Sequence, residues 1–156
     1  MHQDDRWRLT HLGRRLSRAL DRFDRRVLEL MTHSPQAPLG LSHLAARGQV
    51  GAAIVQITRH LSLEGLRLTE LARRAGMTKQ AMGGLVDECE AWGLVQRQAD
   101  PRDHRAKIIV FTPTGLDWLQ AFRQAVQWAE AEFRDDVGDQ VAAVVGLGLE
   151  AYAPDE

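Results

Sequence analysis

The chain has 156 residues, of which 44% are hydrophobic and 26% charged, a balance typical of one globular domain with a real hydrophobic core. No apolar run approaches the roughly 18 residues that span a membrane, and the amino terminus lacks the basic-then-apolar order of a secretory signal. A single cysteine, Cys89, excludes an internal disulfide and every zinc site built from several cysteines. We therefore expect a cytoplasmic protein without a membrane partner.

The formal net charge of −1 conceals an uneven distribution of charge along the chain. Residues 1–33 contain eight arginines and five acids, whereas residues 116–156 contain two arginines and nine acids. A polyanion could therefore bind only to a local basic patch. The net charge itself neither supports nor excludes a nucleic-acid partner.

The first predicted element is one long helix from Arg6 to Met31, in which apolar residues recur at steps of three and four. They are Leu9, Leu12, Leu16, Leu20, Phe23, Val27 and Leu30. The opposite face is rich in arginine, and Pro35 and Pro38 end the pattern. A helix of this length has little to pack against in so short a chain, so we expect a partner helix.

A compact pair of helices is expected in the middle of the chain. It follows a short helical turn over Leu41–Arg47 and a buried helix over Ala52–Leu61. Thr69 is expected to cap the first helix of the pair, and Thr78 the second, which runs from Lys79 to Trp92. Gly76 between them suits a left-handed turn residue. Two helices joined by a short turn with glycine are typical of a helix-turn-helix.

The second helix of the pair has one apolar and one polar face. The apolar residues expected in the core are Met82, Leu85, Val86 and Cys89. The hydroxyl of Thr78, the charge of Lys79 and the amide of Gln80 lie near the helix start, where recognition helices contact phosphates and base edges. The later acids, Asp87, Glu88 and Glu90, would repel phosphates. An ordinary helical hairpin with solvated polar ends is the alternative interpretation.

Gly83 and Gly84 weaken the middle of this helix, since each costs roughly 1 kcal/mol relative to alanine. Two missing side chains would let DNA approach closely. Tolerated weakness, or close packing against another helix, would explain them equally well.

A β-hairpin is expected next, with strands over Leu94–Gln98 and Ala106–Phe111 and a projecting seven-residue loop over residues 99–105. The loop contains Arg102 and Arg105, whose guanidinium groups could enter a narrow minor groove with its enhanced negative potential. Alternatively, one of these arginines pairs with a neighbouring aspartate and only stiffens the loop.

The chain is expected to end in two further helices. Thr112 caps the first, which has Pro113 at its first position and an apolar stripe of Leu116, Leu119, Phe122, Val126 and Phe133. Gly138 interrupts the pattern. The last helix presents Val141, Val144, Val145, Leu149 and Tyr152.

Several short motifs together resemble the MarR (multiple-antibiotic-resistance regulator) family. They are Thr69-Glu70-Leu71-Ala72, Met77-Thr78-Lys79-Gln80-Ala81-Met82, Leu85-Val86-Asp87, Trp92-Gly93-Leu94-Val95, Asp100-Pro101-Arg102-Asp103-His104-Arg105-Ala106-Lys107 and Phe111-Thr112-Pro113-Thr114-Gly115. The resemblance is strong over residues 67–116, and the order of helices on either side agrees with it. It departs from the family at Gly83 and Gly84, where larger polar residues are common, and in the proline- and glycine-containing stretch 34–50.

The resemblance implies a mainly α-helical winged helix-turn-helix with a small β-hairpin wing. Residues 41–115 would bind DNA, and residues 1–40 with 116–156 would form a helical dimerisation region. The DNA contacts that it implies come from Thr78, Lys79, Gln80, Gly83, Arg102 and Arg105. It also implies that a small aromatic or anionic effector binds between the two regions, for which the candidate residues are Arg15, Phe23, Ile57 and His60.

Other kinds of site are poorly supported. The six histidines are scattered without paired spacing on one helix, and no nucleophile–base motif or phosphate-binding loop is present, so we expect neither a metal nor a cofactor nor enzymatic activity. Cys89 is expected to be a small core residue. Trp7, Trp92, Trp118 and Trp128 are more typical of core or interface than of a pocket.

The sequence therefore predicts a homodimeric winged helix-turn-helix regulator that binds a pseudo-palindromic operator in double-stranded DNA and represses transcription. The alternative is a winged-helix module for protein–protein interaction, in which the acidic tail docks a partner.

Overall fold

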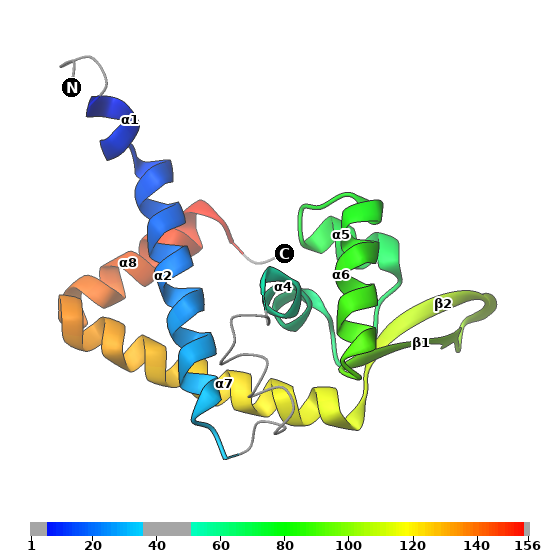
Figure 1. Cartoon of the computed structure of the whole chain (residues 1–156). Helices are drawn as coiled ribbons and strands as arrows, with labels where there is room; N and C mark the ends of the chain where they lie inside the picture. Colours follow the sequence, from blue (N-terminus) through cyan, green and yellow to red (C-terminus); the bar gives the residue numbers. More distant parts are fainter. Residues whose placement is uncertain (1–5, 36–50, 155–156) are drawn as a thin grey trace. The chain divides into compact units, whose positions relative to one another are not determined.

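The computed structural model describes residues 6–35 and 51–154, and it is mainly helical with one two-stranded antiparallel sheet, as the sequence predicts (Figure 1). The elements are α1 (Arg6–Thr10), α2 (Leu12–Thr32), α4 (Ala52–His60), α5 (Leu68–Arg74), α6 (Lys79–Ala91), β1 (Val95–Asp100), β2 (Asp103–Phe111), α7 (Pro113–Val137) and α8 (Asp139–Tyr152). The helical turn expected over residues 41–47 lies outside the described residues.

The chain divides into two compact units. The terminal unit comprises Met1–Leu30 and Arg123–Glu156, and the winged unit comprises Met31–Phe122. Both divisions fall inside a helix, so α2 and α7 each contribute to both units.

In the winged unit, α4 and α5 both pack against α6, and many of the buried side chains come from these helices and from the sheet. Those that are almost wholly buried include Ile54, Ile57, Leu71, Met82, Val86, Cys89 and Ile109. Removing each large aliphatic side chain from water stabilises the fold by about 1.5–3 kcal/mol. The expected core face of α6 is confirmed, except that Leu85 is only half-buried.

The turn between α5 and α6 has the geometry that the sequence predicts. Gly76 has a φ of +63°, in the left-handed region that favours glycine. Thr78 has extended backbone angles, and its Oγ1 accepts a hydrogen bond from the Ala81 N–H at 3.1 Å. This cap occupies one of the free N–H groups at the start of α6 and fixes where that helix begins.

The prediction that Thr69 caps α5 is wrong, because α5 begins at Leu68 and Thr69 lies inside its first turn. The helix start is set by a long-range contact instead. The backbone of Leu66 forms an isolated bridge with Ile109 of β2, so the chain is extended up to Arg67 and turns helical directly after it.

The hairpin prediction is right in its strands and wrong in its loop. Strands β1 and β2 continue to Asp100 and Asp103, so two residues connect them where the sequence predicts seven. The register slips between Ala99, which pairs with Lys107, and Asp100, which pairs with Asp103. The extra residues of β2 are absorbed there as an irregularity. The hairpin still extends away from α5 and α6, as expected (Figure 1).

The amino-terminal helix is interrupted where one continuous helix is expected. His11 forms a bend between α1 and α2, and its Nδ1 accepts a hydrogen bond from the Arg14 N–H at 3.2 Å. The imidazole thereby caps the start of α2, a role that the spacing of apolar residues does not show.

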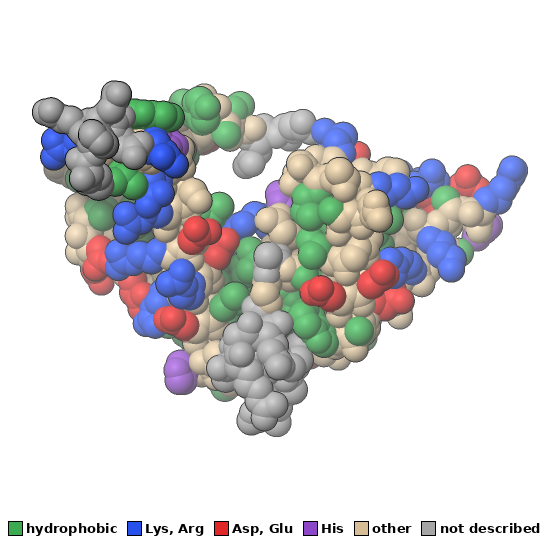
Figure 2. Space-filling view, turned by 45° about the horizontal axis from the view of Figure 1, so that its top comes forward, with side chains coloured by type: hydrophobic (Ala, Val, Ile, Leu, Met, Phe, Trp, Pro, Cys, Tyr) green, Lys and Arg blue, Asp and Glu red, His purple; other side chains and the backbone are tan. Residues whose placement is uncertain are grey.

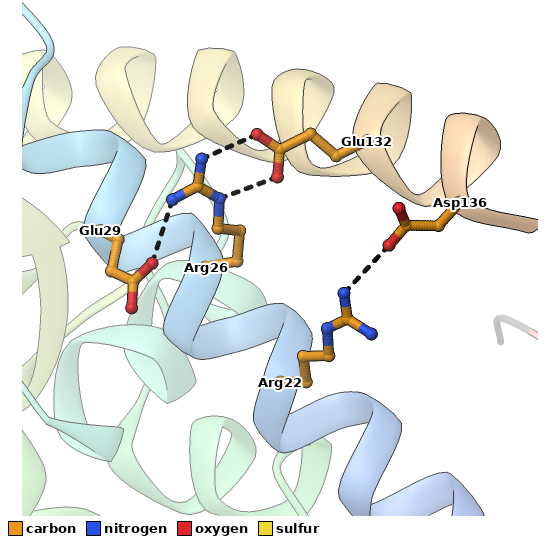
Figure 3. Close-up of polar contacts among 5 residues, drawn as sticks. All are labelled: Arg22, Arg26, Glu29, Glu132 and Asp136. Carbon is orange, nitrogen blue, oxygen red and sulfur yellow. Dashed lines mark hydrogen bonds and ion pairs between the residues drawn. The ribbon is translucent and has the colours of Figure 1, made fainter.

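Within the terminal unit, α2 is joined to the end of α7 by ion pairs (Figure 3). Arg26 donates two hydrogen bonds of 2.8 Å to Glu132 and one of 3.1 Å to Glu29. Arg22 contacts Asp136 at 3.0 Å. Hydrogen bonds from Arg26 hold the pKa of Glu132 below its ordinary value.

Much of the apolar surface of these helices is exposed in the single chain. The exposed large hydrophobic side chains of α1 and α2 are Trp7, Leu9, Leu12, Leu16 and Leu20, and those of α8 are Val141, Val144, Val145, Leu147, Leu149 and Tyr152. On α7, the buried face consists of Trp118, Ala121, Ala125 and Ala129. The sequence predicts that the larger apolar residues of α7 form its buried stripe. Two of these residues, Leu116 and Phe133, are instead exposed by 44% and 37%.

Candidate nucleic-acid interface

The first turn of α6 presents polar groups to solvent. Thr78, Lys79 and Gln80 are all exposed. The free N–H groups and the positive end of the dipole at a helix start attract phosphate, and the Lys79 ammonium adds a full charge. Gln80 presents an amide that can bond to the edge of an adenine in the major groove. This turn can therefore contact both the backbone and the bases of DNA.

The two glycines of α6 are not required by packing. A Cβ placed on Gly83 would lie 3.7 Å from Leu68 Cδ2, which is ordinary van der Waals contact. Among the described residues, no heavy atom lies within 4 Å of a Cβ placed on Gly84. Among residues 6–35 and 51–154, close helix packing therefore does not explain the two glycines. Gly83 lies one helical turn beyond Lys79 and Gln80 on the same side of the helix and is half-buried.

The wing carries exposed cations at its tip. Arg102 and Lys107 are exposed, and the side chain of Arg105 is 97% exposed with only a 4.0 Å contact to Asp103. Lys and Arg side chains are visible along the projecting hairpin (Figure 2). Arg102 and Arg105 also bond to aspartates through their backbone N–H groups. The alternative in which one arginine pairs with a neighbouring aspartate therefore applies to Arg105, whose Nε lies 4.0 Å from Asp103 in a long ion pair.

Two further residues fix the wing turn, and the sequence analysis missed their link. Asp100 is 5% exposed and accepts hydrogen bonds from the Arg102 N–H at 2.9 Å and from Arg67 Nε at 2.8 Å. These two donors, the backbone N–H first, hold the pKa of Asp100 below its ordinary value. The pairing joins residues 33 positions apart, which local patterns do not reveal.

The acids in the second half of α6 are largely neutralised. Arg97 of β1 contacts Asp87 at 2.7 Å and Glu90 at 3.1 Å. The expectation that these acids repel phosphates is therefore too strong for two of the three, since a guanidinium lies against them. Arg97 was not singled out from the sequence, although its position two residues into a predicted strand beside α6 offered a signal.

One protein-family model matches this part of the chain. The model of the MarR family matches residues 49–106, which contain α4, α5, α6 and most of the wing. Over these residues the chain is similar to the MarR family, and the matched segment is the helix-turn-helix with the adjoining part of the wing.

Several solved structures share the fold across almost the whole chain. The reduced form of MarR from E. coli is 19% identical, with 93% of this chain and 98% of that chain covered and a TM-score of 0.71. A mutant MarR from E. coli complexed with operator DNA is 18% identical, with coverage of 95% and 97% and a TM-score of 0.70. CouR from Rhodococcus jostii RHA1, bound to p-coumaroyl-CoA, is 24% identical, with 93% of both chains covered and a TM-score of 0.64. The search of curated proteins returns no match.

The four effector-site candidates differ in their surroundings. Arg15 is exposed and Phe23 half-buried in the terminal unit, whereas Ile57 is 2% exposed and His60 half-buried in the winged unit. Desolvation, followed by the nearby charges of Arg59 and Arg74, lowers the pKa of His60. Ile57 belongs to the core of the winged unit, and the other three have surface that a ligand could reach.

The remaining candidates behave as structural residues. Cys89 is fully buried, and burial together with the charge of Glu88 raises the pKa of its thiol to about 12. A thiol that is neutral at physiological pH is a poor nucleophile. Trp118 is 1% exposed, whereas Trp7 and Trp128 are exposed by 66% and 40%. Within residues 6–35 and 51–154, no cluster of histidine, cysteine or acid suits a metal ion, and no helix is long and apolar enough to cross a membrane.

Proposed function

We propose that the protein is a regulator of the MarR family, a cytoplasmic homodimeric repressor whose winged part, residues 41–115, binds a pseudo-palindromic operator. The observation that carries this proposal is the pairing of an exposed, polar first turn of α6 with an exposed basic wing. The first supplies base readout and the second supplies phosphate or minor-groove contacts. A dimer seated on its operator would exclude RNA polymerase from an overlapping promoter, which is how it would repress.

The terminal parts, residues 1–40 and 116–156, are proposed to form the dimer. Exposed leucines on α2 and exposed valines on α8 make up more apolar surface than a stable monomer usually leaves in water. A twofold dimer that buries them would place two α6 helices about 34–36 Å apart, one turn of DNA.

The DNA contacts are assigned to Thr78, Lys79, Gln80, Gly83, Arg102 and Arg105. They can be tested by measuring the affinity of variants for a selected duplex and for random DNA as salt is varied. Gln80→Ala should cost about 1–3 kcal/mol on the selected duplex alone. Arg102→Ala or Arg105→Ala should weaken binding to both and flatten the salt dependence by roughly one charge each.

The opposite results would overturn these assignments. If the Gln80 and wing variants lose affinity equally on both duplexes, the division between base readout and backbone contact is wrong. If the wild-type protein shows no salt-sensitive binding to DNA, a protein-interaction module with an acidic docking tail becomes the better interpretation.

We further propose that a small aromatic or anionic molecule controls DNA binding. CouR, which has the same fold, is bound to an aromatic acyl thioester with an anionic carrier, p-coumaroyl-CoA. Arg15, Phe23, Ile57 and His60 are the proposed contacts. An effector must prefer one spacing of the two α6 helices, because equal affinity for both spacings would leave DNA binding unchanged.

Titration of aromatic carboxylates and their thioesters tests this proposal through tryptophan fluorescence and DNA affinity recorded together. A compound that binds and releases DNA supports it. A broad panel without a binder at millimolar concentration would argue that only protein abundance controls the regulator.

A further inference from the structure

The ion pair between Arg67 and Asp100 connects the wing to the helix-turn-helix. Arg67 lies directly before α5, and Asp100 is the last residue of β1. Both Nε and one terminal nitrogen of Arg67 lie 2.8 Å from Asp100 Oδ2. The Asp100 side chain is only 8% exposed, whereas that of Arg67 is 47% exposed. A nearly buried carboxylate at the tip of an exposed hairpin needs such a partner.

Arg67 is brought close to Asp100 because the backbone of Gly65 and Leu66 lies directly against that of Ile109 in β2. Gly65 has a φ of +86°, and a Cβ there would lie 2.8 Å from the carbonyl oxygen of Ile109. Its absence lets Leu66 exchange backbone hydrogen bonds of 3.1 and 2.8 Å with Ile109. Arg67 is thereby held beside the sheet, and its guanidinium donates to Asp100.

The other oxygen of Asp100 holds the wing turn. Oδ1 accepts the Arg102 N–H, so one carboxylate joins the turn, the end of β1 and the start of α5. A two-stranded hairpin by itself is at best marginally stable in water. Without this connection, the outer part of the wing would depend on its few strand hydrogen bonds to keep its direction.

We propose that Arg67 and Asp100 are positioning residues, which hold the wing cations in a fixed direction relative to α6 so that both elements contact one duplex. This inference rests on the proposed DNA binding. A wing already ordered in the free protein avoids the entropy cost of ordering it on DNA. Arg67 would then act through Arg102 and Arg105, without contacting DNA.

The competing view, that Arg67 contacts phosphate directly, makes the opposite prediction for Asp100. Asp100→Asn removes a negative charge, which by simple electrostatics should tighten binding, and it would free Arg67 for phosphate. If Asp100 positions the wing, the same substitution should weaken binding about 3- to 10-fold, because wing order is lost. The affinity should also fall less steeply as the salt concentration rises, because fewer wing cations contact the phosphates.

Glu70 and Arg73 offer matched controls within α5, where Arg73 pairs with Glu70 at 3.0 Å and Arg74 pairs with the same carboxylate at 3.1 Å. Glu70→Gln makes the same charge change as Asp100→Asn, and Arg73→Gln the same change as Arg67→Gln. We expect the Asp100 and Arg67 variants, and their double variant, to lose affinity to a similar extent for a duplex selected from a random library. We expect Glu70→Gln to bind as tightly as the wild type or more tightly, and Arg73→Gln to lose less than Arg67→Gln.

Hydrogen exchange of the Arg102 amide tests the anchor without DNA. It should accelerate in Arg67→Gln and remain unchanged in Arg73→Gln, with melting curves to show that each variant is folded. Equal or tighter DNA binding by Asp100→Asn would overturn the positioning role, and unchanged exchange in Arg67→Gln would overturn the anchor itself. A wild-type protein that selects no duplex would instead overturn the proposed function, which separates the two failures.

Discussion

The guanidinium of Arg97, on β1, lies 2.7 Å from the carboxylate of Asp87, on α6. It also reaches Glu90 one turn later, so a single cation offsets two acids on the helix proposed to enter the major groove. With its side chain 27% exposed, Arg97 is more shielded from water than either acid. Strand β1 therefore offsets part of the negative charge of α6 through Arg97.

Replacing Arg97 with methionine should weaken DNA binding severalfold, because Asp87 and Glu90 would then repel the phosphates within a Debye length. The loss of folding stability should be modest, at up to about 1 kcal/mol, since these ion pairs are partly exposed. Affinity titration and urea unfolding measure the two effects. Adding Asp87→Asn to the Arg97 variant should restore most of the affinity, and failure to restore it would indicate that Arg97 contacts DNA itself.

Alanine at Gly83 or Gly84 should stabilise the protein by about 0.5–1 kcal/mol, because both sites have room for a Cβ and alanine favours helix. Gly83→Ala should nevertheless lower DNA affinity, since its methyl group would project between Lys79 and Gln80. Gly84→Ala is the matched control for helix propensity. If Gly83→Ala gains stability and binds DNA like the wild type, Gly83 does not face the duplex.

Cys89 should resist alkylation and oxidation in the folded protein and react readily after unfolding in urea. Its folded pKa of about 12 lies above the unfolded value near 9, so the unfolded state loses this proton first as the pH rises. The contribution of Cys89 to stability is thus complete below about pH 9 and is lost progressively toward pH 12. Cys89→Ala should flatten this alkaline decline, and rapid labelling of the native protein would contradict the buried placement.

The dimer should depend on the exposed leucines of α2. Leu16 and Leu20 are 36% and 49% exposed in the single chain, so glutamate at either position should cost little in the folding of one chain. In the dimer it would bury a charge, which is strongly unfavourable. Light scattering at micromolar concentration should give twice the chain mass for the wild type and a lower mass for the variants. A wild-type monomer would refute the assigned dimer surface.

Features governed by local chemistry were predictable from the sequence. Thr78 caps α6 because a hydroxyl three residues before Ala81 can accept its N–H, and this requires no distant partner. The core face of α6 follows from the spacing of Met82, Val86 and Cys89. The exposure of Thr78, Lys79 and Gln80 follows from the same periodicity.

Features that depend on distant partners were not predictable. The sequence predicts Thr69 as the cap of α5, but the bridge of Leu66 to Ile109 places the capping position two residues earlier, at Arg67. The polar residues after Ala99 looked like a loop, yet Asp100 finds Arg67 across the fold and holds a tight turn. On α7, small alanines are buried and larger residues such as Leu116 are left outside, because the direction of a helical face depends on what packs against it.

Selection of binding sites from random duplex DNA, with the mass of the resulting complex measured in solution, tests the central claim most directly. The account predicts an enriched sequence of two inverted half-sites with centres about 10 base pairs apart, since that spacing matches two α6 helices related by a twofold axis. It also predicts two chains per duplex. Enrichment of a single asymmetric half-site bound by one chain, or no enrichment over the starting library, would contradict it.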